Sequence, residues 1–296
     1  SGGTIVGTKV LAGDKENITV TGGTFQNSSG TSVNVSEYLP SGMTQDENGT
    51  VQTDTEKAVA SVKGISYSTL QEAIKNAKPG DTVKLLKSTE GSGIVIPEGS
   101  ELTIDLNRCT YTVTSAVGST GTESNGFQLL KDSTITFKNG TITAGAPAVQ
   151  ILIQNYSNLT LDNVTLNDKN SSCSYMLSNN NGDVQIEDST ITAPANSFAF
   201  DVCWGPNKGY PDGTQVTVEG NSKINGKVEI GVWGDLTGQP DSKSTLHITG
   251  GEFNGEIVVD EALKERPKKG MFPSPAARSE MPVGSRLMSA ATLSPA

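Results

Sequence analysis

One short pattern recurs along the chain and constrains its fold more than any other feature. In each copy one polar residue lies between two apolar residues. Two or three turn-forming residues follow, and then another apolar residue. The copies start at residues 102, 135, 159, 184, 216 and 246. Taking one apolar residue of each as a register mark gives 106, 137, 161, 186, 218 and 248, so the steps are 31, 24, 25, 32 and 30 residues. A period of this length is typical of proteins built from stacked repeats.

Within each copy the apolar residues alternate with polar ones, which predicts a strand with one buried face. Two or three strands per repeat bury too little surface alone, so each coil must stack on its neighbour, and the sequence predicts a solenoid. Asn and Gly between the strands fit the tight corners that such coils need. Further short strands are expected between the copies, at 127–130, 149–153, 198–202, 228–232 and 256–259.

Composition supports an all-β chain and excludes several function classes. Hydrophobic residues make up 34% and aromatic residues 5% of the 296 residues, and the chain holds 33 Gly, a mixture that disfavours a helical bundle. A net charge of -10 argues against nucleic-acid binding, which needs a basic surface. No apolar run approaches the roughly 18 residues of a membrane span, and no signal peptide is recognisable.

A short helix is predicted at 68–78, ahead of the repeats. Its apolar residues fall at 70, 73, 74 and 77, Ser68 is the expected N-cap, and Pro79-Gly80 ends it. We expect this helix to cover the open end of the first coil, because an uncovered coil exposes unpaired strand edges.

Three stretches carry a resemblance to a known family: residues 65–74, 79–86 and 102–107. They resemble the opening of pectate-lyase-like right-handed parallel β-helices, and in particular β-helical surface proteins of Gram-positive bacteria and their phages. The resemblance covers roughly residues 58–260. It implies a right-handed single-stranded parallel β-helix of about seven coils with a short N-terminal capping helix.

Three segments are expected from these patterns. Residues 1–57 form an N-terminal arm or the end of a preceding β-helix module, because residues 18–25 match residues 246–253 nearly position for position around a Gly-Gly-x-Phe unit. The polar stretch 45–57 is interpreted as the linker to the β-helix, 58–260.

The third segment, 261–296, is expected to be an extended, basic, Pro-rich arm. It holds six basic and three acidic residues, so it carries +3 and the other 260 residues carry -13. Five prolines exclude a helix interior and a central strand. A solvated tail is the plain interpretation, but apolar residues between the prolines favour an arm that docks on an acidic surface or completes a homo-oligomer.

Aligned copies are predicted to stack one polar column on the outside of a sheet, about 4.8 Å per step. Within it Asp162, Glu187 and Glu219 form an acidic column, with Asp188 beside it. Such carboxylates could ligate Ca²⁺, or could supply a pair for glycoside hydrolysis. The alternative is a solvated acidic edge screened by salt. The full column is expected to comprise Asn107, Lys138, Asp162, Glu187, Glu219 and Thr249.

The catalytic motifs of the resembling enzymes do not carry over to this chain. The lyases use an arginine and a base beside bound calcium, whereas the only arginine within the coils is Arg108, in a turn. The hydrolases use paired Asp and a His motif, whereas the single histidine, His247, lies on the outward side of a strand with no Asp pair nearby. Enzymatic activity is therefore not supported by any motif.

Two Trp-Gly pairs, at Trp204 and Trp233, lie 29 residues apart, which is about one coil. Stacked at one corner, with Tyr210 in the loop between them, they could form an aromatic ledge that binds sugar. The alternative is that both indoles pack under the loop 206–213.

The three cysteines, Cys109, Cys173 and Cys203, follow no metal-binding or redox spacing. They are interpreted as small buried apolar residues, while a Cys173–Cys203 disulfide is compatible with the sequence but not required by it.

These observations favour a non-enzymatic structural or adhesive β-helix protein at a bacterial cell surface or in a phage virion, outside the cell. The alternative is a β-helix that binds or degrades a polysaccharide. The expected partners are a surface glycan, a neighbouring structural protein or further copies of the chain. Neither binding to nucleic acid nor a membrane-spanning segment is expected. No cofactor is expected, although the acidic column could bind calcium.

Overall fold

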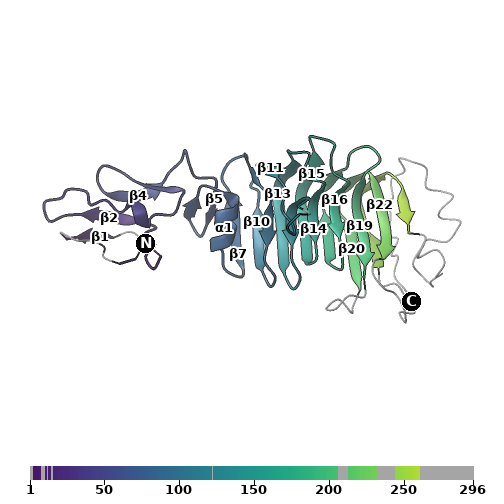
Figure 1. Cartoon of the computed structure of the whole chain (residues 1–296), viewed down its shortest axis with the longest axis horizontal. Helices are drawn as coiled ribbons and strands as arrows, with labels where there is room; N and C mark the ends of the chain where they lie inside the picture. The colour runs from purple at the N-terminus through teal and green to yellow at the C-terminus, as the bar shows by residue number, and fades with distance from the viewer. Residues whose placement is uncertain are drawn as a thin grey trace. The chain divides into compact units, whose positions relative to one another are not determined.

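A computed structural model of the chain describes residues 3–7, 11, 13, 14, 16–121, 123–205, 213–232 and 244–260. The chain divides into two compact units, Ser1–Ser88 and Thr89–Ala296. Both are built mainly from β-strands, and the second unit consists of long parallel sheets (Figure 1). No helix among the described residues is long and apolar enough to cross a membrane.

The first unit begins with a small mixed sheet in the order β1-β2-β4-β3. Its strands are Thr4–Val6, Gly23–Gln26, Thr50–Thr53 and Met43–Gln45, respectively, and a 3-10 helix spans Ser36–Tyr38. Its buried core consists of Val20, Phe25, Val35, Met43 and Val51.

The interpretation of residues 45–57 as a linker is wrong, because half of a hairpin lies there. Strand β3 pairs antiparallel with β4, and Val51 is buried in the core of the small sheet. The turn between the strands is held by Asp46, whose Oδ1 accepts hydrogen bonds from the backbone N–H groups of Asn48 and Thr50. Asp-x-Asn-Gly is a turn sequence, and this signal was available at 46–49.

The two matching Gly-Gly-x-Phe units adopt the same local structure. Gly23 and Gly251 both have a left-handed backbone, with φ of 100° and 98°; strand β2 begins at Gly23, and strand β24 begins directly after Gly251. The following Phe25 and Phe253 are both buried. The apolar residues ahead of the units differ, since 246–248 lie in a strand and 18–20 do not.

The rest of the first unit contains the predicted helix. Strands β5 (Ala60–Val62), β6 (Ile65–Tyr67) and β7 (Asp81–Leu85) pair antiparallel, and helix α1 (Leu70–Asn76) contacts all three. Leu70, Ala73 and Ile74 form its buried face, as the spacing predicts.

The N-cap of α1 is Thr69, not the predicted Ser68. Thr69 Oγ1 accepts a hydrogen bond of 3.1 Å from the backbone N–H of Glu72, and Ser68 Oγ instead donates to the Glu72 carboxylate. Both hydroxyls serve the helix start, so the local sequence alone does not distinguish which of them occupies the cap.

The second unit stacks its strands in three parallel ladders (Figure 1). The first contains β10 (Glu101–Asp105), β13 (Thr134–Ala144), β15 (Asn158–Asp168), β17 (Asp183–Glu187), β20 (Thr214–Glu219) and β23 (Ser244–Ile248). The second is a seven-stranded sheet of the described residues, with β9 (Ile94–Ile96), β12 (Asn125–Leu129), β14 (Ile151–Asn155), β16 (Tyr175–Asn179), β19 (Phe198–Trp204), β22 (Lys227–Val232) and β25 (Ile257–Val259).

The third ladder uses the second halves of β13 and β15, which continue around a corner. The other strands of this ladder are β8 (Thr89–Ser92), β11 (Thr110–Ser115), β18 (Thr190–Thr192), β21 (Lys223–Asn225) and β24 (Glu252–Asn254). In the second unit, strands β8, β9, β11, β16 and β21 are additional to those expected from the sequence. Parallel ladders with these connections are compatible with a β-helix.

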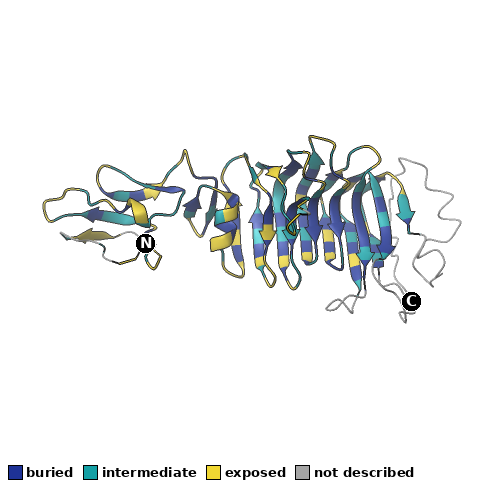
Figure 2. Ribbon diagram, in the orientation of Figure 1, coloured by how far each residue is buried: buried dark blue, intermediate teal, exposed yellow. Residues whose placement is uncertain are grey.

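The apolar register positions form one continuous buried column, as the repeat predicts. Strand pairing aligns Ile104, Phe137, Leu161, Ile186, Val218 and Ile248. All six are buried, while the residues next to them along each strand are more exposed. Figure 2 shows this alternation of buried and more exposed residues along the strands. The first register mark, 106, is wrong by two residues, because Ile104 pairs with Phe137.

Candidate functional site

The outward side chains of β13, β15, β17 and β20 form a surface of hydroxyls, amides and carboxylates, which we call the polar face. Strand alternation places these side chains opposite the buried column. Because the strands pair in direct register, equivalent side chains stack in columns at the strand spacing of about 4.8 Å. One such column consists of Thr136, Thr160, Gln185 and Thr217.

An open groove of about 300 Å³ lies along the polar face. Its lining residues are Thr134, Asn158, Leu159, Thr160, Asp183, Val184, Gln185, Gln215, Thr217 and Glu219. Four of these side chains are joined by hydrogen bonds: Gln185 Nε2 donates to Glu219 Oε1, and Gln215 Nε2 donates to Thr217 Oγ1 at 3.3 Å. The groove therefore offers donors and acceptors in fixed positions to a ligand rich in hydroxyl groups.

The predicted acidic residues lie on successive strands, next to the groove. Asp162 pairs with Glu187, and Glu187 pairs with Glu219, so the three carboxylates form one column on the polar face. All three side chains are half-buried. The residue of the first coil in this column is Asp105 rather than Asn107, because of the two-residue shift in register.

Asp188 and His247 have other local roles. Asp188 has a left-handed backbone at the corner after β17, and its Oδ1 accepts hydrogen bonds from the backbone and side-chain nitrogens of Asn221. It therefore fastens two neighbouring corners. His247 Nε2 lies 3.1 Å from Gln215 Oε1, where it extends the hydrogen bonding of the polar face by one strand.

No three His, Cys, Asp or Glu side chains of the described residues are grouped so that they could hold a metal ion. Calcium binding by Asp162, Glu187 and Glu219 stays a prediction.

Trp204 does not present its indole to solvent. Its side chain is only 1% exposed, and in the sheet it pairs with Val232. A buried indole cannot act as a platform for sugar, so at Trp204 the observed burial agrees with the packing alternative. The other two members of the expected ledge, Tyr210 and Trp233, lie outside the described residues.

A second group of polar residues, on the seven-stranded sheet, was not found from the sequence. Asp201 on β19 pairs in register with Glu229 on β22, so the backbones of the two residues are one strand spacing apart. The side chain of Asp201 is 5% exposed. Glu229 Oε2 accepts a 2.7 Å hydrogen bond from the hydroxyl of Tyr175, which lies on β16 and thus reaches across β19. The signal in the sequence was a lone Asp within the apolar run 198–204.

Burial raises the pKa of Asp201 to about 7, and the neighbouring Glu229 carboxylate adds to this effect. The backbone N–H of Asn179 and the hydroxyl of Ser178 both donate to the Asp201 carboxylate and oppose the shift in pKa. The pKa of Tyr175 is also raised, first by burial and then by its hydrogen bond to Glu229.

The cysteines are free thiols. Cys173 is buried and donates to the Val149 carbonyl, and burial raises its pKa. Cys203, two residues beyond Asp201, is half-buried, and its pKa is raised first by burial and then by Asp201. A raised pKa keeps both thiols protonated and chemically inert at neutral pH. Cys109 is also half-buried, so of the three thiols only Cys173 is fully buried.

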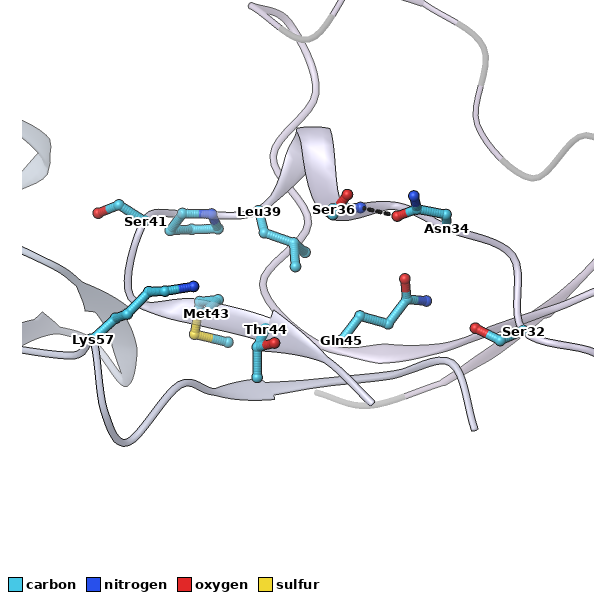
Figure 3. A pocket seen from close by; sticks show the side chains of 10 residues that line it. Ser32, Asn34, Ser36, Leu39, Ser41, Met43, Thr44, Gln45 and Lys57 are labelled. Atoms are coloured by element: carbon cyan, nitrogen blue, oxygen red, sulfur yellow. Dashed lines mark hydrogen bonds between the residues drawn. The ribbon is translucent and has the colours of Figure 1, made fainter. Parts of the chain in front are cut away.

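The first unit has a pocket of its own, of about 520 Å³, between the segment 32–41 and strand β3 (Figure 3). Leu39 and Met43 are the apolar residues labelled in its lining, and Lys57 lies at one end. Gln45 in the lining is fully engaged, because it bonds the backbone of Val33, Val35 and Gly49. Lys57 Nζ pairs with Asp54 at 3.2 Å, so the polar groups of this pocket chiefly hold the unit together.

Comparisons of the chain with protein-family models, with curated proteins and with solved structures found no match.

Proposed function

We propose that this protein is a non-enzymatic structural and adhesive β-helix that binds a neutral polysaccharide along its polar face. The observation that carries the proposal is the groove beside in-register columns of Thr and Gln side chains. An extended polymer that lies across successive strands meets equivalent donors and acceptors at regular intervals. The carboxylates along the same face disfavour an acidic polysaccharide, because like charges repel.

The finer description of the fold belongs to this proposal. The parallel ladders support a right-handed single-stranded β-helix, since crossovers between parallel strands are almost always right-handed. Helix α1 is proposed as the cap of this β-helix. A continuous buried column would make the β-helix rigid, as a spacer or an attachment module requires.

We place the protein at a bacterial cell surface or in a phage virion, with a surface glycan or a neighbouring structural protein as its partner. A polar, acidic exterior supports this placement, because it keeps an exposed protein soluble.

Binding is tested by affinity electrophoresis of the full chain in gels that contain neutral or acidic polysaccharides. The expected result is retardation by one or more neutral polysaccharides. Gln185→Ala combined with Gln215→Ala should weaken binding at least about tenfold, because two ordered amides of the groove are lost. Thr165→Ala combined with Thr190→Ala, on the third ladder, is the matched control and should bind like the unmodified protein.

Two outcomes would overturn the proposal. Equal loss of binding in the control pair, or no retardation by any polysaccharide, would show that the polar face is not a glycan site. Release of new reducing ends that Asp162→Asn or Glu187→Gln abolishes would show instead that the protein is a polysaccharide-degrading enzyme.

A further inference from the structure

The Asp201–Glu229 pair lies where three strands of the seven-stranded sheet are tied together by side chains. Asp201 on β19 accepts hydrogen bonds from Ser178 and from the backbone of Asn179, both on β16. Glu229 on β22 is bonded to Tyr175, also on β16. These contacts fasten β16, β19 and β22 to one another in addition to the backbone ladder.

The pair carries two carboxyl groups and faces no cation in the ion pairs recorded among the described residues. The titratable groups around it are Tyr175 on β16, Cys203 on β19 and Tyr156 after β14, all neutral when protonated, and Asp260 after β25 lies near Cys203. Lys227 on β22 lies over the Phe198 ring, with its Nζ 6.0 Å from the ring centre.

We propose that the Asp201–Glu229 pair is a pH-sensitive lock that holds β22 tightly to β19 in mild acid and less tightly above neutral pH. When Asp201 is protonated, the pair carries at most one negative charge, on the half-buried Glu229. When its proton is released to solvent, a second negative charge appears beside Glu229 in a water-poor environment, and the two repel each other.

The direction in which stability changes with pH follows from the difference in proton binding between the folded and unfolded states. The pKa of Asp201 in the folded protein, about 7, is above its usual value of 3.8. The folded state therefore binds more protons than the unfolded state between these two values, and stability falls as the pH rises through this range. The loss is complete once the pH exceeds the pKa of the folded protein.

Hydrogen exchange of the full chain, read by mass spectrometry and corrected for intrinsic exchange rates, tests the lock. Amides of β19 and β22 should lose at least about tenfold in protection between about pH 5 and about pH 8.5, relative to amides of β13, since one pKa unit corresponds to a tenfold change. Asp201→Asn keeps the acceptor oxygen for Asn179 but cannot ionise, so it should abolish this loss.

Asp162→Asn is the matched control, because Asp162 forms an in-register pair with Glu187 but is only half-buried. It should retain the pH response of β19 and β22. Glu229→Gln removes the like charge and leaves the hydrogen bonds of Asp201 intact, so it should reduce the loss of amide protection at high pH. This variant replaces Asp201→Asn in the test if Asp201→Asn does not fold. An unchanged pH response in Asp201→Asn and Glu229→Gln, or its disappearance in Asp162→Asn, would overturn the proposal.

Discussion

Single apolar side chains in the buried column are expected to contribute strongly to the stability of the second unit. Ile186 on β17 is fully buried and pairs with Leu161 and Val218 on the adjacent strands. Its side chain thus contacts the coil on either side, and removing it leaves a cavity between coils that cannot close.

We predict that Ile186→Ala lowers the free energy of unfolding by about 3 kcal/mol, through lost apolar burial and the remaining cavity. Thr160→Ala, at a half-exposed position of the polar face, should change it by less than about 0.5 kcal/mol. Urea denaturation followed by circular dichroism measures both values. Similar values for the two variants would contradict the assignment of Ile186 to the core.

A second residue, Asp81, should make the stability of the first unit depend on pH in the opposite direction to Asp201. Hydrogen bonds from Lys63, at 2.6 Å, and from the backbone of Lys78 lower the pKa of Asp81. A lowered pKa stabilises the folded state above the usual pKa of an aspartate, and this contribution is lost as the pH falls through the lower folded value.

Asp81→Asn should therefore lower the thermal midpoint of the first unit at neutral pH, and lower it progressively less as the pH falls below the usual aspartate pKa of 3.8. Thermal unfolding at several pH values measures the difference. Lys63→Met should give a similar loss at neutral pH, and the double variant should lose less than the two single losses combined. Additive losses would mean that the two side chains do not act as a pair.

At the scale of structural elements, the corners after the first ladder depend on residues that tolerate a left-handed backbone. Asn139, Asn163 and Asp188 occupy this corner in successive coils, with φ of 57°, 54° and 47°. Asn163 Nδ2 also donates to Asn139 Oδ1 at 3.3 Å, so neighbouring corners are tied together. Asn, Asp and Gly adopt this conformation at low cost, whereas β-branched residues do not.

We predict that Asn163→Val costs about 2 kcal/mol of stability and that Asn163→Gly changes it by less than about 0.5 kcal/mol. The exposed position of Asn163 excludes a packing effect. Thr165→Val, two residues further along β15, is the control for adding a β-branched apolar residue and should be nearly neutral. Equal stability of Asn163→Val and Asn163→Gly in urea would show that the corner carries no conformational requirement.

At the scale of the whole molecule, the segment 261–296 and the rest of the chain have opposite net charges. We therefore predict that this segment takes part in assembly. This segment lies outside the described residues, so the expectation rests on its sequence: a charge of +3 against -13, with apolar residues spaced between its prolines. Opposite charges favour docking of such an arm on an acidic surface.

Removal of residues 264–296 should leave a folded protein that no longer forms homo-oligomers or attaches to its partner. Light scattering of the full and shortened chains at the same concentration measures the mass of each. Circular dichroism should show the same strand content in both, which separates lost assembly from lost folding. If both chains have the same mass and the same attachment, the segment is only a solvated tail.

The sequence by itself determined the strands of the repeated copies and predicted that they stack. Alternation at 135–137, 159–161, 184–186 and 216–218 requires one buried face, and the repeat spacing brings equivalent positions into register. It did not determine the first register, because Leu102, Ile104 and Leu106 are all apolar and all buried. The choice between them depends on the corner at Asn107 and Arg108, where two successive residues have a left-handed backbone.

Burial and charge at single polar residues were decided only by the tertiary structure. The raised pKa of Asp201 results first from burial between strands that are more than twenty residues away in the sequence, and then from the charge of Glu229. Trp204 is buried although its sequence is compatible with an exposed corner, and Val51 lies in a core although its neighbours are polar. Local patterns report which side chains need burial, but the electrostatic environment of a carboxyl group is set by the side chains that folding brings next to it.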